Sequence, residues 1–228
     1  MGNEVIVACS IGLIEIFSEQ FICVDSDYPL DGVYHDFYFP AMSAPLTLRY
    51  EYKDVKGESY IDRTANPIKG RAGIRWSGLP QFEHQQHRLF PHELMFSTVR
   101  DLDCVSLQRD EGAEFRPEWM PQADVSDWTA TRKSISECEL VITSCTAVAH
   151  LAGAMGVKTW IIVPVLPYYL WALKGNKTPY YDSVTLFRQE KYGWWEAPFV
   201  KIKETINPEN SEIFEYGLKN TLPDPVFV

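Results

Sequence analysis

The chain has 228 residues, of which 46% are hydrophobic and 23% charged, a balance typical of a globular protein with a core of its own. Its formal net charge is −10 and no basic stretch offsets it, so we expect neither nucleic-acid binding nor attachment to anionic membranes. The apolar stretch at 159–173 is short and contains Pro164 and Pro167, which argues against a membrane span.

The first part of the chain predicts only a few elements of an α/β structure. A short helix with an apolar face is expected at 11–18, and strand patterns lie at 4–8, 20–24 and 35–39. The polar stretch at 53–70, which contains glycine and proline, is interpreted as a linker. Because these elements are too few to close a core, we interpret residues 1–66 as a partial α/β segment.

From Arg71 onward, strand patterns alternate with helical ones. The strands are predicted at 71–76, 103–107, 140–143, 159–163 and 184–187. Helices are predicted at 91–100, at 127–138 with Asp127 as the cap, after the turn at 144–146, and near the end of the chain around Trp194-Trp195 and 208–218. This alternation predicts a Rossmann-like, doubly wound parallel sheet over residues 67–228.

The stretch at 139–164 is the clearest strand–helix–strand unit in the sequence. Its first strand ends in Ser144-Cys145-Thr146 and opens directly into a helix of small residues, which breaks at Gly156 before the second strand. In such units ligands lie at the carboxyl ends of the strands, where helix N-termini present N–H groups. The turn is therefore the first candidate phosphate site, although on pattern alone an ordinary Ser/Thr N-cap explains it better.

Other side chains near this turn are candidates for ligand binding. Gly78 follows a strand and would let the backbone approach a ligand, and Arg88 in the same loop can bind a phosphate in bidentate fashion. His150, one turn inside the helix, can hydrogen-bond a phosphate or a ribose. Each also has a purely structural explanation. Gly78 can belong to a connecting turn, Arg88 can be a solvent-exposed loop arginine, and His150 can be a structural histidine with its hydrogen bonds made within the protein.

Cys145 at the helix start is a candidate thiolate, because the helix dipole lowers the pKa of a thiol. His150 is the only nearby base and no third partner is evident, so a cysteine-dependent hydrolase is a distant third hypothesis. The chain has no CxxC pair and no secretory signal, which together predict reduced thiols and a cytoplasmic protein. Its five cysteines are Cys9, Cys23, Cys104, Cys138 and Cys145.

Two further groups of residues, three histidines and a cluster of aromatic residues, have patterns that resemble binding sites. We expect no metal site at His84, His87 and His92, because Pro91 breaks any shared helix face and no fourth ligand is in register. An aromatic cluster could stack on a base or a sugar ring, and packing between loops explains it equally well. It consists of Tyr168, Tyr169, Trp171, Tyr180 and Tyr181.

An ordered set of short motifs extends from Arg71 to about Gln189. It comprises Gly73-Ile74-Arg75-Trp76-Ser77-Gly78, Arg88, Ser106-Leu107-Gln108, Asp127 with Thr131, Glu139-Leu140-Val141-Ile142, Thr146-Ala147-Val148-Ala149-His150-Leu151-Ala152-Gly153, Pro179-Tyr180-Tyr181-Asp182-Ser183 and Leu186-Phe187-Arg188-Gln189. Together these motifs resemble the C-terminal, donor-binding domain of GT-B glycosyltransferases. The closest likeness is to heptosyltransferase-like enzymes, related to ADP-heptose:LPS heptosyltransferases and often linked to tetratricopeptide repeats.

The resemblance implies that the substrate is a nucleotide-sugar donor, with its diphosphate near Thr146 and Gly78, and that no cofactor or metal is needed. Many relatives carry aspartate where this chain has Cys145, which alters the polarity of that turn. No catalytic base is identified. The residues that the resemblance assigns to the donor are Ser77, Gly78, Arg88, Gln108, Asp127, Thr131, Cys145, Thr146, Ala147 and His150.

The segment at 4–63 resembles only the latter half of the family's acceptor domain, so we expect a chain that is shortened relative to its family. Whether a second copy of the chain or a partner chain completes that domain is left open. Two functions follow. The first is a glycosyltransferase-like protein that transfers a sugar to an unknown glycan, lipid or protein acceptor. The second is a non-catalytic nucleotide- or glycan-binding module derived from such an enzyme.

Overall fold

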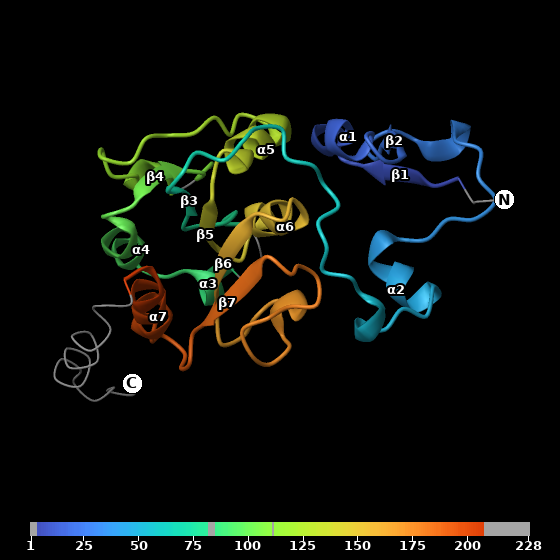
Figure 1. The fold of residues 1–228 in the computed structure, drawn as a ribbon. Helices are drawn as coiled ribbons and strands as arrows, with labels where there is room; N and C mark the ends of the chain where they lie inside the picture. The colour runs from blue at the N-terminus through green and yellow to red at the C-terminus, as the bar shows by residue number, and fades with distance from the viewer. Residues whose placement is uncertain (1–3, 82–84, 111, 208–228) are drawn as a thin grey trace.

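The structure, a computed structural model, describes residues 4–81, 85–110 and 112–207, which contain two parallel β-sheets (Figure 1). The smaller sheet pairs β1 (Ile6–Cys9) with β2 (Ile22–Asp25). The larger sheet has the strand order β4-β3-β5-β6-β7, and every pair in it is parallel. Its strands are β3 (Arg71–Arg75), β4 (Asp103–Ser106), β5 (Leu140–Ser144), β6 (Lys158–Val163) and β7 (Val184–Arg188). The predicted parallel sheet is confirmed.

Helices cover both faces of the five-stranded sheet. One face packs against α4 (His92–Val99) and α7 (Glu196–Ile206), and the other against α5 (Trp128–Ser136) and α6 (Ala147–Ala154). Successive residues of β6 alternate between the two cores: Trp160 and Ile162 belong to the first, Ile161 and Val163 to the second. Because both faces are covered, the strand reads as a continuous hydrophobic run, as expected for a parallel sheet.

The strand order places a topological switch between β3 and β5. The chain proceeds from β3 outward to β4, and then returns to the other side of β3 to add β5, β6 and β7 in turn. In sheets of this type, ligands bind outside the carboxyl ends of the strands near the switch. The fold is therefore Rossmann-like and α/β, and it directs attention to the loops that follow β3 and β5.

The N-terminal part, residues 4–70, buries far fewer side chains than the rest of the described chain. Besides β1 and β2 it contains α1 (Ile11–Phe17), α2 (Ala44–Thr47) and short 3-10 turns. The predicted strand at 35–39 is wrong, because the structure has no strand in this described segment. Phe37 and Tyr38 are 90% and 84% exposed. The aromatic pattern resembles a strand, but no neighbouring strand is present to pair with it.

The segment at 53–70, which we predicted to be a linker, is hydrogen-bonded to the five-stranded sheet and its helices, residues 71–207, which we call the larger unit. The backbone N–H groups of Tyr60 and Ile61 donate to the carbonyl oxygen of Ala154, at 2.9 and 3.1 Å, and Gly57 accepts a hydrogen bond from Asp182 N. We call residues 57–64 the strap. The side chains of the strap are mostly polar and exposed, but its backbone is hydrogen-bonded to the larger unit.

Near the C-terminal end, α7 accounts for the closing helix predicted around Trp195, while the helix predicted at 208–218 lies outside the described residues. None of the helices in the described part of the chain combines the length and hydropathy required to cross a bilayer.

Candidate functional site

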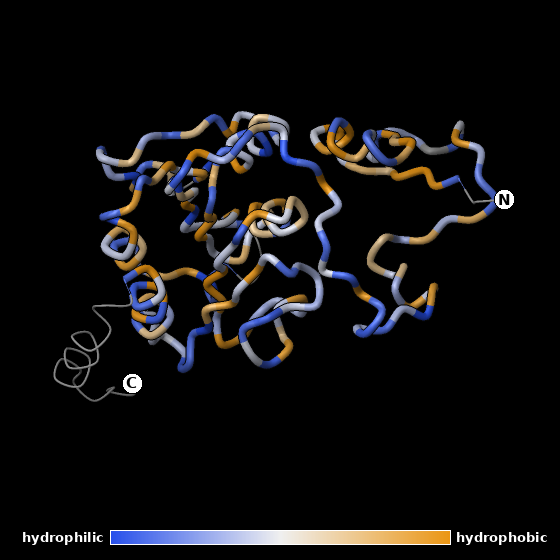
Figure 2. The backbone as a smooth tube through the Cα atoms, in the orientation of Figure 1, coloured by the Kyte–Doolittle hydropathy of each residue, from blue (hydrophilic) through white to orange (hydrophobic). Residues whose placement is uncertain are grey.

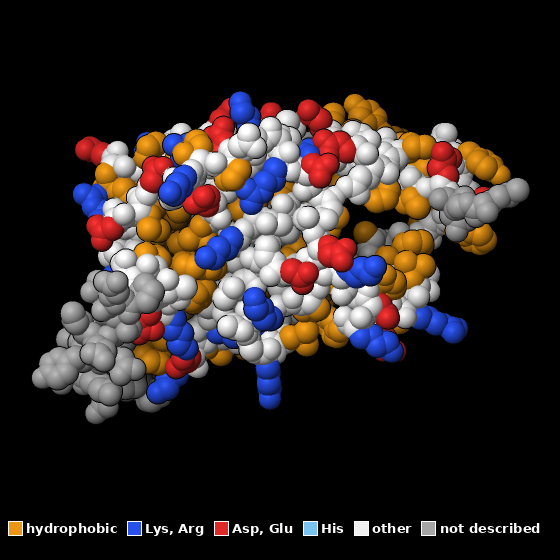
Figure 3. All heavy atoms as spheres, in the orientation of Figure 1, with side chains coloured by type: hydrophobic (Ala, Val, Ile, Leu, Met, Phe, Trp, Pro, Cys, Tyr) orange, Lys and Arg blue, Asp and Glu red, His pale blue; other side chains and the backbone are white. Residues whose placement is uncertain are grey.

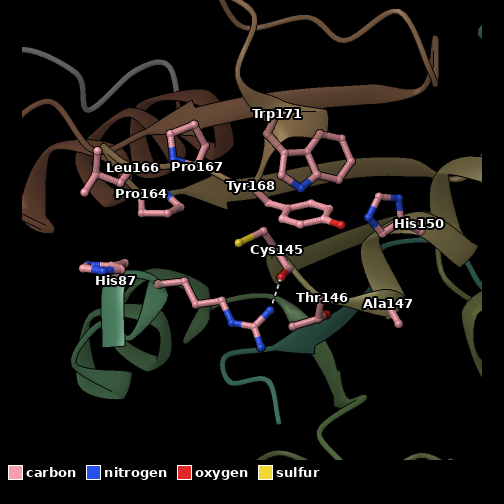
Figure 4. Close-up of a pocket in the computed structure, with 11 residues that line it drawn as sticks. His87, Cys145, Thr146, Ala147, His150, Pro164, Leu166, Pro167, Tyr168 and Trp171 are labelled. Carbon is pink, nitrogen blue, oxygen red and sulfur yellow. Dashed lines mark hydrogen bonds between the residues drawn. The ribbon is translucent and has the colours of Figure 1, made fainter. Parts of the chain in front are cut away.

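The candidate site is a cavity of about 460 Å³ at the carboxyl edge of the five-stranded sheet (Figure 4). Because all five strands are parallel, the loops after β3, β4, β5 and β6 all begin at this edge. Five of the residues that the family resemblance assigns to the donor line the cavity, and they come from the end of α3, the turn after β5 and the first turn of α6: Arg88, Cys145, Thr146, Ala147 and His150.

The N-terminus of α6 forms one wall of the cavity. Thr146 occupies the N-cap position, but its hydroxyl makes no capping hydrogen bond and lies 3.3 Å from the hydroxyl of Thr143. Thr146 is therefore at the N-cap position, as the structural alternative predicted, but its side chain does not cap the helix. The first N–H groups of a helix have no intrahelical acceptor and carry the positive end of its dipole, so this wall favours an anion.

Arg88 brings a positive charge to the same wall. It lies at the end of α3 (Gln85–Arg88), and its Nη1 donates to the carbonyl oxygen of Cys145 at 2.6 Å. Its Nε donates to Gln85 Oε1, also at 2.6 Å. A Cβ atom at Gly78 would lie 2.6 Å from Arg88 Cζ. The close approach that we predicted for Gly78 is therefore an approach to Arg88, and the glycine makes room for the guanidinium.

Ser77 and Gln108 lie next to this wall and do not line the cavity. Gln108 Oε1 accepts hydrogen bonds from the backbone N–H groups of Trp76 and Ser77, at 3.2 and 3.0 Å. Its Nε2 donates to Ser77 O and to Arg109 O. The buried amide of Gln108 thus holds the loop after β3 in place, and the loop in turn supports Arg88 through Gly78.

Asp127 and Thr131 are used inside α5 and do not line the cavity. Asp127 Oδ1 accepts from Ala130 N at 2.7 Å, which confirms the predicted helix cap. The hydroxyl of the buried Thr131 donates to the carbonyl oxygen of Asp127 at 2.6 Å. Their assignment to the donor site stays a prediction from the family resemblance alone.

His150 lies at the aromatic end of the cavity. Its ring stacks on that of Trp171 with 4.8 Å between centroids and 22° between planes, and Nδ1 lies 3.1 Å from the hydroxyl of Tyr181. Burial lowers the pKa of His150 to about 4. The imidazole is therefore neutral at pH 7, so it can offer a ligand a hydrogen bond but no charge.

Cys145 faces the cavity with its sulfur atom (Figure 4). Burial raises the pKa of this thiol, and the nearby Arg88 opposes the rise only in part. The thiol is thus protonated at neutral pH, contrary to the activated thiolate that the helix dipole alone would favour. All five cysteines are free thiols, and burial raises the pKa of Cys104 and of Cys138 to about 12, as expected of reduced core cysteines.

The opposite wall comes from the loop after β6 and was only partly anticipated. The sequence singled out Tyr168 and Trp171 as stacking aromatics, but it gave no role to the other residues of this wall, which are Pro164, Leu166 and Pro167. His87, next to Arg88 on α3, also lines the cavity and was named in the sequence only as a possible metal ligand. Applying the carboxyl-edge rule to β6 as well as β5 would have found Pro164.

The loop that carries this wall is held from β7. Arg188 donates to the carbonyl oxygens of Trp171, Leu173 and Gly175 at 2.6 to 2.8 Å. Gln189 Oε1 accepts from Val165 N at 3.1 Å. The last two residues of the Leu186–Gln189 motif therefore shape the cavity without lining it.

In the described part of the chain, no three His, Cys, Asp or Glu side chains gather around a possible ion. His87 lies on the cavity wall, whereas the imidazole of His92 stacks on Phe115 at 4.4 Å. His84 lies outside the described residues.

The two ends of the cavity differ in chemistry. Arg88 and the first turn of α6 suit a phosphate, whereas Tyr168, Trp171 and the neutral His150 suit a ring with hydroxyl groups. A nucleotide combines both features in one molecule. Comparisons with protein-family models, with curated proteins and with solved structures found no match for this chain.

Proposed function

We propose that the chain binds a nucleotide-diphosphate sugar in this cavity and transfers the sugar to a glycan, lipid or protein acceptor, as GT-B glycosyltransferases of the heptosyltransferase-like group do. The observation that carries the proposal is the placement of Arg88 beside the N-terminus of α6, with an aromatic wall opposite. A leaving nucleoside diphosphate is stabilised by such N–H groups and a cation without a bound metal. The order of motifs from Arg71 to Gln189 supports the same proposal.

The alternative is a module that binds a nucleotide or glycan without transferring a sugar. A specific observation favours it: among the described residues that line the cavity, none is a carboxylate. Sugar transfer with an acceptor hydroxyl requires a general base within hydrogen-bond reach. The cavity lining contains the imidazoles of His87 and His150 in place of a carboxylate, and His150 lies at the aromatic end of the cavity.

Substitution of Arg88 tests the binding step that both functions share. We expect UDP, GDP or ADP, or a sugar derivative of one of them, to raise the melting temperature of the wild-type protein, because a ligand that binds only the folded state stabilises it. Arg88→Ala should weaken binding by about 10- to 100-fold, as loss of a charge-assisted hydrogen bond does. Isothermal titration calorimetry measures the change directly.

Arg100→Ala is the matched control, because this exposed arginine follows α4 and stacks on Trp119, away from the carboxyl edge. It should bind as the wild type does. Absence of a thermal shift with every nucleotide, or equal affinity of the Arg88 and Arg100 variants, would contradict the proposed site. Release of free nucleoside diphosphate from a sugar nucleotide in the presence of an acceptor distinguishes the transferase from the binding module.

A further inference from the structure

Tyr181 is a buried tyrosine with no place in the proposed function. It is 7% exposed and does not line the cavity, yet its hydroxyl lies 3.1 Å from His150 Nδ1. Its ring packs so closely on α6 that a Cβ atom at Gly153 would lie 2.6 Å from Tyr181 Cγ. The glycine therefore allows Tyr181 to reach the histidine on the preceding turn of the helix.

The hydrogen-bond partner of the Tyr181 hydroxyl is His150 Nδ1. A neutral imidazole nitrogen is a stronger hydrogen-bond acceptor than a phenol oxygen, so the Tyr181 proton belongs on the bond to His150. Burial raises the pKa of Tyr181, which keeps that proton on the phenol. The direction of donation is then from Tyr181 to His150 Nδ1.

This arrangement fixes the tautomer of His150. If Nδ1 accepts a hydrogen bond, it carries no proton, so the proton of the neutral ring must be on Nε2. Among the described residues, the imidazole has no hydrogen-bond partner other than Tyr181. Because His150 lines the cavity and Nδ1 is directed to a residue that does not, Nε2–H is the donor left for a ligand.

We propose that Tyr181 is a positioning residue that holds His150 as an Nε2–H donor to a ribose hydroxyl of the bound nucleotide. The inference rests on the proposed function. Thr146 and His150 are four residues apart on α6, about 6 Å along the helix axis, so one ligand can place its phosphate at the helix start and its ribose one turn further on. The Trp171 ring that stacks on His150 fixes the plane of the donor.

The tautomer is tested without any ligand. In the wild-type protein, ¹⁵N–¹H correlation spectra of the imidazole should show the Nε2–H form of His150. Tyr181→Phe should produce a mixture of tautomers or the Nδ1–H form. Tyr180→Phe is the matched control, since the adjacent ring packs edge-on against Tyr52 at 6.3 Å and should leave the His150 spectrum unchanged. An unchanged spectrum in Tyr181→Phe would overturn the positioning role.

The ribose contact is tested by comparing UDP, GDP and ADP with their 2′,3′-dideoxy forms by calorimetry. The wild type should prefer the ribose form by about 3- to 10-fold, the effect of one hydrogen bond. In Tyr181→Phe this preference should fall toward one, whereas a merely structural loss would weaken both forms equally. A preference that persists in Tyr181→Phe would refute the contact. Absence of all nucleotide binding would refute the proposed function and the ribose contact together, and the spectra would still decide the role of Tyr181.

Discussion

The two sheets of this molecule contain similar strands and bury them to very different extents. β6, in the five-stranded sheet, is buried at every position after Lys158, whereas no residue of β1 is fully buried. Figure 2 shows hydrophobic residues in the strands of both sheets. The difference therefore does not lie in the hydrophobicity of the strand. It lies in how many elements are available to cover it.

A parallel sheet requires cover on both faces, and a two-stranded sheet with one short helix cannot supply it. Among residues 4–70, the buried hydrophobic side chains that the structure describes are Ile16 and Ile61. Hydrophobic side chains reach the surface around the N-terminal part in Figure 3. The hydrophobic pattern of a strand is thus a local property of the sequence, whereas its pairing and burial depend on the neighbouring elements.

Besides the strap, α1 and α5 form a contact between the N-terminal part and the larger unit. Arg132 of α5, only 4% exposed, donates to both carboxylate oxygens of Glu19 at 2.6 and 2.9 Å. The hydroxyl of Thr129 donates to Glu15 Oε2 of α1 at 2.9 Å. These hydrogen bonds surround a hydrophobic contact, because Ile16 of α1 belongs to the buried core that covers one face of the larger sheet.

The largest expected effect comes from the same substitution made in each sheet. Ile142→Ala in β5 removes a side chain that is 0% exposed and should lower the free energy of unfolding by about 2–5 kcal/mol. Ile22→Ala in β2, where the side chain is 49% exposed, should cost less than about 1 kcal/mol. Urea denaturation followed by circular dichroism measures both changes.

Tryptophan fluorescence serves as the internal check, because all seven tryptophans lie after Arg71 and belong to the larger unit, although Trp128 also adjoins α1 at Gly12. Ile142→Ala should shift the fluorescence transition to lower urea concentration, and Ile22→Ala should leave it in place. Equal shifts for the two variants would mean that β1 and β2 share the core of the five-stranded sheet, and the contrast between the sheets would be wrong.

The elements of the larger unit could be predicted closely from the sequence. Its strands are buried hydrophobic runs between turns, and each predicted boundary lies within one or two residues of the observed one. The failures are in the N-terminal part. The strand at 35–39 required a neighbour that the sequence does not supply, and the strap at 57–64 is fixed by hydrogen bonds to α6 that no local pattern encodes.

The site was predictable where it follows from strand ends and helix starts. Thr146 and His150 line the cavity because the helix after β5 begins at the carboxyl edge of the sheet. The contact between Gly78 and Arg88 depends on the path of a loop, which sequence spacing does not determine. The role of Tyr181 depends on a contact between residues thirty-one positions apart, for which the sequence offered only a tyrosine in an aromatic cluster.

A smaller effect is expected on the stability of the larger unit at acidic pH, where the buried His150 becomes important. The pKa of His150 is lowered from its ordinary value of 6.5 to about 4 in the folded protein. Between these values the unfolded state binds a proton that the folded state does not, so the free energy of unfolding falls as the pH decreases from about 6.5 toward 4. The loss is on the order of 3 kcal/mol when complete.

His150→Gln removes this titration, and its stability should therefore change less with pH across the same interval. His35→Gln replaces an exposed histidine of the N-terminal part and should retain the steeper wild-type profile. Urea denaturation at half-unit steps from pH 4 to 7 provides the comparison. A profile for His150→Gln as steep as that of the wild type would show that other groups cause the acid sensitivity.

The smallest expected effect lies at the ion pair between Arg132 and Glu19, which joins the two parts. The hydrogen bonds from Arg132 lower the pKa of Glu19, so the ionised carboxylate stabilises the contact above its ordinary pKa of 4.5, and this stabilisation is lost as the pH falls through the lower folded value. Glu19→Gln imitates that loss at neutral pH. Because an exposed carboxylate contributes little, amide hydrogen exchange in α1 should accelerate by less than about fivefold, while exchange in β5 and β6 stays unchanged.

Glu4→Gln makes the same charge change at an exposed residue before β1 and should alter neither exchange rate. Faster exchange in the five-stranded sheet of Glu19→Gln would show that the two parts open as a single unit, contrary to the difference in burial between them.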